Sequence, residues 1–278
     1  MRRFTKAEGY TLVELLIVMA IVGMVAAAIF GVHQVSQDIY TRATALEDAQ
    51  LGARAGLDRM ASELRLIGSF WVGASGAGNA ITVATPTSIT FMANVDDRSV
   101  IGGAEATPNP TATGTSVPLS LSATATADAF KVYMANPDVN NDYIYIANGG
   151  RREVKRITAI NGSTLTLAPP PETPLSSAYP AGSLVRDVKI ITYTRNAVAT
   201  STCPALTCLT RSQGGSGADP VVDNVVDLTF TYFDTVGGAL GANPTASAIR
   251  EIQMSLTTQG ADGSRRTMTS RVKPRNLP

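Results

Sequence analysis

The sequence predicts an α+β protein in which one long N-terminal helix packs on an antiparallel β-sheet domain. Apolar residues run almost without interruption from Leu15 to Val32, and apolar spacings of three and four residues then continue to about Gly68. Beyond residue 70, short β-rich segments alternate with turn residues. The 278 residues suffice for one larger domain or two small ones.

The N-terminal apolar run predicts a membrane-spanning helix. With residues 10–13 added, it reaches the roughly 20 residues that cross a bilayer. Arg2, Arg3 and Lys6 precede the run, which predicts that the N-terminal tip lies on the cytoplasmic side. Glu14 lies inside the run, and a carboxylate there needs an interaction that offsets its cost in lipid.

The second half of the helix is predicted to be amphipathic, with one apolar stripe. The stripe consists of Val35, Ile39, Ala43, Leu46, Ala49, Ala53, Leu57, Met60, Leu64 and Ile67. The charged residues off this stripe are Asp38, Arg42, Arg54, Asp58 and Glu63. Gly31, Gly52 and Gly56 are expected to be soft points. A coiled-coil stem is the alternative, but packing against a sheet is preferred because strand signals follow directly.

Period-two and β-rich patterns predict the strands of the globular part. They are expected at Ser88–Ala93, Phe130–Met134, Tyr143–Ala147, Glu153–Ile160, Thr164–Ala168, Val185–Thr194, Val225–Phe233, Ile249–Thr257 and Arg266–Val272. Asn161-Gly162 predicts a hairpin turn, and the last two strands should form a hairpin that closes near Gly260–Gly263. Residues 101–128 are low in complexity and are expected to form a surface insertion.

Composition and motifs exclude most enzyme classes. One His removes His-based triads and multi-His metal sites, and no Gly-rich phosphate loop is present. We therefore expect no enzymatic activity, no cofactor and no metal. Asp138, Asn140 and Asp142 have the spacing that begins a calcium loop, but the later positions depart from it, so a turn is preferred. The net charge of +1 gives no general field for nucleic acid.

The C-terminal end is basic. Its cations are Arg265, Arg266, Arg271, Lys273 and Arg275. Such a strip can contact phosphates or an acidic neighbour. A solvated edge strand that uses charge against aggregation is the preferred interpretation.

The segment from Gly9 to Glu14 resembles the class III signal of type IV pilins and of type II secretion pseudopilins. In that family a prepilin peptidase cuts after the Gly and N-methylates the next residue. The resemblance implies cleavage after Gly9, an N-methylated Tyr10, and a Glu14 that pairs with the N-terminal amine of a neighbouring subunit. Two features depart from the commonest pattern, since Tyr10 stands where Phe is usual and Glu8 lies beside the cut.

The resemblance implies a type IV pilin-like division of the chain. Residues 1–9 would be the leader, 10–34 the transmembrane and filament-core helix, 35–68 the amphipathic helix, and 69–278 the β-rich pilin domain. The chain would be a single-pass inner-membrane protein before assembly and would then lie in the periplasm or in a cell-surface pilus. That destination favours a disulfide between Cys203 and Cys208.

The C-terminal segments NVVDLTFTYFD, IREIQMSLTT and SRVKPRNLP resemble PilW-type minor pilins and J-type pseudopilins of type II secretion. This implies a minor pilin that joins other minor pilins to initiate filament assembly at the tip. The implied partners are other minor pilins, the major pilin, prepilin peptidase and the inner-membrane assembly platform. A secretion pseudopilin, or a tip adhesin or DNA-uptake receptor, is the alternative.

Overall fold

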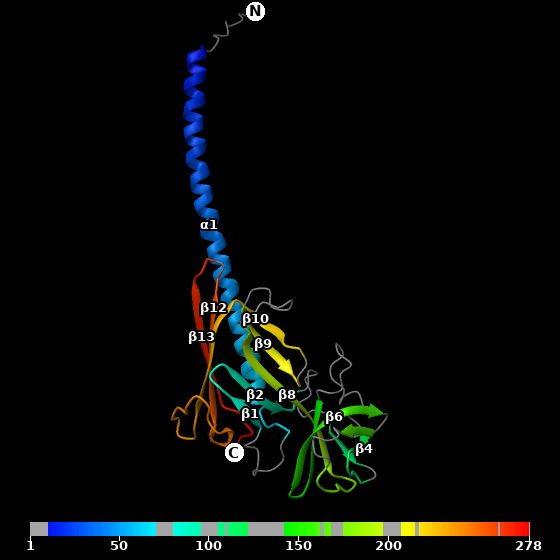
Figure 1. Ribbon diagram of the computed structural model, residues 1–278. Helices are drawn as coiled ribbons and strands as arrows, with labels where there is room; N and C mark the ends of the chain where they lie inside the picture. The colour runs from blue at the N-terminus through cyan, green and yellow to red at the C-terminus, as the bar shows by residue number, and fades with distance from the viewer. Residues whose placement is uncertain are drawn as a thin grey trace, which may run out of the picture.

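The computed structural model shows one long helix that projects from a body of β-strands (Figure 1). The structure describes residues 11–70, 80–95, 105–108, 111–121, 142–161, 164–167, 175–196, 207–214, 217–260 and 262–277. The helix is α1 (Leu12–Arg65). The α+β fold class predicted from the sequence is confirmed, with α1 packed on antiparallel sheets.

The strands of the described part follow α1 in chain order. They are β1 (Ile81–Ala84), β2 (Ser88–Ala93), β3 (Glu105–Pro108), β4 (Ser116–Leu121), β5 (Asp142–Asn148), β6 (Arg151–Asn161), β7 (Thr164–Leu167), β8 (Leu184–Asn196), β9 (Cys208–Gln213), β10 (Asp219–Asp223), β11 (Val225–Phe233), β12 (Glu251–Gln259) and β13 (Arg265–Val272). A short 3-10 turn, η4 (Ala246–Ala248), lies between β11 and β12.

Helix α1 has a defined start and stop. Thr11 is its N-cap, and the Thr11 hydroxyl accepts a hydrogen bond from the Glu14 amide in a capping box. At the other end the Leu66 amide donates to the carbonyls of Glu63 and Leu64. Gly68 follows with φ of 72°, a left-handed conformation that glycine adopts at low cost. The 54 residues span about 80 Å at 1.5 Å per residue.

The two halves of α1 differ in burial. Every residue from Leu12 to Ala43 is exposed, whereas the buried residues begin at Ala53. The predicted stripe is therefore exposed at Val35, Ile39 and Ala43. Its first half-buried residue is Leu46. The projecting half has the length and apolarity of a membrane span (Figure 1).

Two sheets hold the packed half of α1. The β12–β13 hairpin reaches along the helix, where the Thr258 hydroxyl donates to the Ala49 carbonyl at 3.2 Å. Strand β10 packs its Val222 side chain against Gly52 and Gly56. A Cβ on Gly56 would overlap Val222, so Gly56 is a site of close approach and not merely a soft point.

The strands form one three-stranded sheet and one larger sheet that closes on itself. The small sheet has the order β11-β12-β13. In the large sheet, β8 pairs with β3 and with β5, and the pairings β3–β4, β4–β7, β7–β6 and β6–β5 complete a closed antiparallel ring of strands. The other half of β8 pairs with β2 and β9, which extend the sheet to β1 and β10.

Each end of the large sheet has its own apolar core. The ring encloses Ile144, Ile146, Val185 and residues of β4, β6 and β7. On the same strands, Tyr145 and Val188 belong to the second core, which also contains the buried face of α1. Along β5 and the first half of β8, alternate side chains face the two cores, so these strands join the ring to the rest of the body.

Several predicted strands agree with the structure and some elements do not. Ser88–Ala93 and Val225–Phe233 match β2 and β11, and both predicted hairpins are present. Phe130–Met134 lies outside the described residues. Strands β1, β3, β4, β9 and β10 were not predicted. The described residues of the 101–128 segment include β3 and β4, which pair with each other within the ring, and the rest of this predicted insertion lies outside the described residues.

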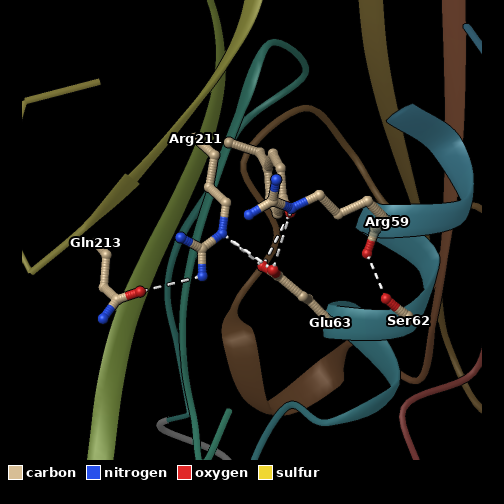
Figure 2. Close-up of polar contacts among 6 residues, drawn as sticks. Arg59, Ser62, Glu63, Arg211 and Gln213 are labelled. Atoms are coloured by element: carbon tan, nitrogen blue, oxygen red, sulfur yellow. Dashed lines mark hydrogen bonds and ion pairs between the residues drawn. The ribbon is translucent and has the colours of Figure 1, made fainter. Parts of the chain in front are cut away.

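The off-stripe interpretation of Glu63 is wrong, because this side chain is buried between α1 and the large sheet (Figure 2). Arg211 of β9 donates through Nε to Oε1 and Oε2 of Glu63 at 3.0 and 2.9 Å. The Tyr193 hydroxyl donates to Oε2 at 2.8 Å, and Arg59 lies 3.6 Å from Oε1. Gln213 accepts from Arg211 at 3.2 Å.

This polar cluster links three elements inside the main core. Burial, together with the neighbouring Glu63 carboxylate, raises the pKa of Tyr193 above its usual 10, so its hydroxyl stays protonated and remains a donor. A buried carboxylate with one charged and one neutral donor is satisfied only when α1 and the sheet are correctly docked. The cluster therefore sets the rotation and height of the helix.

Replacing Gly56 with Ala should destabilise the docked helix, because the stiff Val222 side chain occupies the space of the new methyl group. We expect the unfolding free energy to fall by about 1–3 kcal/mol. Pulse proteolysis of the full chain in detergent measures it. G52A is the matched control, since its Cβ would lie 3.7 Å from the same valine, and it should be neutral or stabilising. Equal effects of the two variants would contradict the close-packing account.

Removing one partner of the buried pair should cost about 3–5 kcal/mol, because R211A removes the two hydrogen bonds that Arg211 donates to the buried Glu63 carboxylate and leaves only the more distant Arg59 beside that charge. The double variant E63M/R211M should recover much of that loss. The exposed Arg271–Glu251 pair is the control, and E251A should cost less than about 1 kcal/mol. The same proteolysis assay applies. Additive effects of E63M and R211M would show that the two residues are not coupled.

Candidate functional site

The candidate functional site is the start of α1, where one carboxylate meets an otherwise apolar helix. Oε2 of Glu14 accepts hydrogen bonds from the Thr11 amide and the Thr11 hydroxyl, both at 3.0 Å. The Glu14 amide donates back to the Thr11 hydroxyl at 3.3 Å. Local sequence explains this arrangement, since Thr at the N-cap and Glu three residues later form a capping box.

The capping box lowers the free-energy cost of placing the Glu14 carboxylate in lipid. Each peptide unit adds to a helix dipole whose positive end lies at the N-terminus, beside the Glu14 carboxylate. The Thr11 donors and this dipole stabilise the carboxylate within its own chain. Glu14 is also fully exposed, so its remaining acceptor capacity is directed outward. A cationic group of another chain can reach it there.

The apolar side chains around Glu14 have no cover from the rest of this chain. Leu12, Val13, Leu15, Leu16 and Ile17 are each more than half exposed, and the pattern continues along the projecting half of α1. Large exposed apolar surfaces mark membrane or protein contacts. A bare apolar helix can lie in a bilayer and can equally pack beside other helices, because both surroundings bury the same side chains.

The other predicted site residues are distributed over the chain. Gly9 and Tyr10 lie outside the described residues, as do Asp138, Asn140 and Cys203. Asp142 is the first residue of β5. Cys208 begins β9, is fully buried and is disulfide-bonded. Among the described residues, no three His, Cys, Asp or Glu side chains gather in a metal-binding group.

The sequence analysis did not identify the residues that orient the packed half of α1. Glu63 lies three residues after Met60 and four before Ile67, which is the spacing of the buried stripe itself. Its charge led to the opposite assignment, and its partner Arg211 lies 148 residues away in sequence. For Gly56, a small residue inside a helical stripe was the available signal of close packing.

The comparisons with known proteins bear on this N-terminal region. A family model described as the prokaryotic N-terminal methylation motif matches residues 5–30. No curated protein and no solved structure matches the chain. The matched residues include the cleavage position predicted at Gly9, the capping box and most of the exposed apolar run. The chain thus carries a class III prepilin signal, which supports its identification as a type IV pilin-like protein with a membrane-anchoring N-terminal helix.

Proposed function

We propose that this chain is a minor pilin of a type IV pilus, which prepilin peptidase processes and which joins other minor pilins to initiate filament assembly at the tip. The single observation that carries the proposal is the methylation motif at the head of a bare apolar helix. The motif supports a pilin-like or pseudopilin subunit. The minor and initiating role rests on the resemblance of the C-terminal segments and on the size of the β-rich body.

The exposed apolar half of α1 and the exposed Glu14 carboxylate support the following mechanism. The precursor enters the inner membrane with its basic end inside, and cleavage after Gly9 creates a new amine at Tyr10. The apolar half of α1 then leaves lipid for a bundle of like helices. Apolar burial changes little in this transfer, so packing and polar pairing decide its direction. Glu14 contributes the polar pairing, because the amine of a neighbouring subunit forms an ion pair with its exposed carboxylate.

The partners follow from the same mechanism. Prepilin peptidase acts on the leader, and the inner-membrane assembly platform lifts the subunit out of the bilayer. Other minor pilins and the major pilin pack around α1. The strand ring lies at the end of the molecule away from the N-terminus (Figure 1), which would place it outward in a subunit at the filament tip.

Two other functions use the same N-terminal helix. A minor pseudopilin of type II secretion would assemble a short periplasmic filament. A tip adhesin or DNA-uptake receptor would use the distal strands or the basic C-terminal end to bind a ligand. Deletion of the gene separates these functions, since loss of pili supports the initiator, whereas normal pili with lost attachment or DNA uptake support the receptor.

Mass spectrometry of sheared surface filaments tests the processing and the location of the protein. We expect an N-terminal peptide that begins with methylated Tyr10, at trace abundance relative to the main filament subunit. A processed protein that stays in the membrane and is absent from surface filaments would favour the secretion pseudopilin. An intact residue 1–9 leader would overturn the pilin assignment.

Replacing Glu14 with Ala should leave membrane insertion intact and lower incorporation into filaments at least about tenfold, about 1.4 kcal/mol of assembly free energy. The variant lacks the carboxylate that pairs with the neighbouring amine. E47A is the matched control, because Glu47 is an exposed acid on α1 beyond the apolar run. Quantitative immunoblots of membrane and filament fractions measure the ratio. Normal incorporation of E14A would remove Glu14 from the assembly mechanism.

A further inference from the structure

The outer edge of the small sheet carries exposed positive charge. Strand β13 is an edge strand, since the described residues pair it only with β12. Four exposed cations lie on β13 or directly after it: Arg265, Arg266, Lys273 and Arg275. Within the described part of the chain, none of the four has an acidic partner at ion-pair distance, whereas Arg271 between them binds Glu251 at 2.7 Å.

An edge of the large sheet carries exposed negative charge. Strand β10 pairs with β9 and ends that sheet. Asp219 and Asp223 stand at its two ends, both exposed, and Asp227 follows on β11. These carboxylates form no ion pair with another described residue. The strand therefore presents negative charge that no cation in the described ranges of the chain compensates.

The two edges flank α1. Strand β11 is the member of the small sheet that contacts β2, β8 and β9, so β13 is the edge farther from the large sheet. Figure 1 shows β13 on one side of the packed half of α1 and β9 and β10 on the other. The molecule thus has a basic flank and an acidic flank, with the helix between them.

Membrane insertion restricts how two copies can meet. Both copies enter with the same end inside, so one is related to the next by rotation about the membrane normal and by translation. A neighbour in the same rotational setting brings its acidic flank against the basic flank of the first copy. A neighbour rotated by 180° about the membrane normal would bring flanks of like charge together, which is unfavourable. Charge therefore selects the head-to-tail contact.

From this geometry we propose that the basic β13 edge docks the acidic β10 edge of a second copy of this chain. The inference rests on the proposed function, because it uses parallel subunits whose helices lie side by side in the inner membrane before filament assembly. The contact joins two different surfaces, so each copy keeps one free edge of each sign. Such contacts generate rings or open helical arrays rather than closed dimers.

The competing interpretation is that the charges only protect the edges. Lysine and arginine on an edge strand hinder unwanted strand pairing, and Pro220 removes one backbone donor from β10. Protection requires charge of either sign, however, and does not require opposite signs on opposite flanks. It also predicts no preferred contact between copies, which makes the two accounts separable.

Directed cross-linking tests the contact in membranes that contain the full chain. One tagged copy carries T269C on the exposed face of β13, and a differently tagged copy carries G217C, just before β10. Native Cys208 is disulfide-bonded and does not compete. A bifunctional thiol reagent should link the mixed pair at least about tenfold more than either like pair, and the excess should vanish near 1 M salt, where the screening length is about 3 Å.

Charge reversal provides the decisive control. R265E/R266E should abolish the mixed cross-link, and adding D219R/D223R on the facing copy should restore it. R151E, an exposed change on β6, should have no effect. Equal mixed and like-pair yields, failure of the reversed pair to restore the link, or links only to a different protein would each overturn the proposal. Leader cleavage, read by mass spectrometry in the same membranes, shows separately whether the proposed function holds.

Discussion

The docking of the second half of α1 onto two sheets is the constraint on which the remaining structure depends. The position of the helix is set by steric packing and by buried polar contacts. The steric match places β10 against Gly56, where the absence of a side chain admits Val222. The polar match places Glu63 between Arg211 and Tyr193. An apolar stripe alone would allow the helix to rotate or slide, whereas a buried carboxylate with fixed donors favours one setting.

This docking divides α1 into two working halves. From Leu12 to Ala43 the helix is exposed, and its apolar surface requires lipid or other helices. Beyond that point the same helix forms part of a core. Because the helix is continuous through both halves, the body stands at a fixed height and rotation relative to the apolar segment. Such rigid coupling suits a subunit whose neighbours are positioned through their helices.

Strand β8 has a comparable role within the body. One of its halves closes a ring with β3 and β5, and the other half lies between β2 and β9. Tyr145 and Val188 face the core that contains α1, while Ile144 and Val185 fill the ring. The ring is therefore attached through shared strands rather than through a linker.

The sequence by itself determined the features that depend on local pattern. The apolar run, the N-terminal signal motif, and the strands with period-two alternation, such as β2 and β11, were predicted from the sequence, because each depends on residues close together in the chain. Only the tertiary structure decided what depends on distant partners. Strands β3 and β4 look like a low-complexity segment until their neighbours in the ring are known, and Glu63 looks solvated until Arg211 lies beside it. Ring closure and buried ion pairs are long-range interactions whose free energy exists only once the whole fold is assembled, so no local window of sequence contains them.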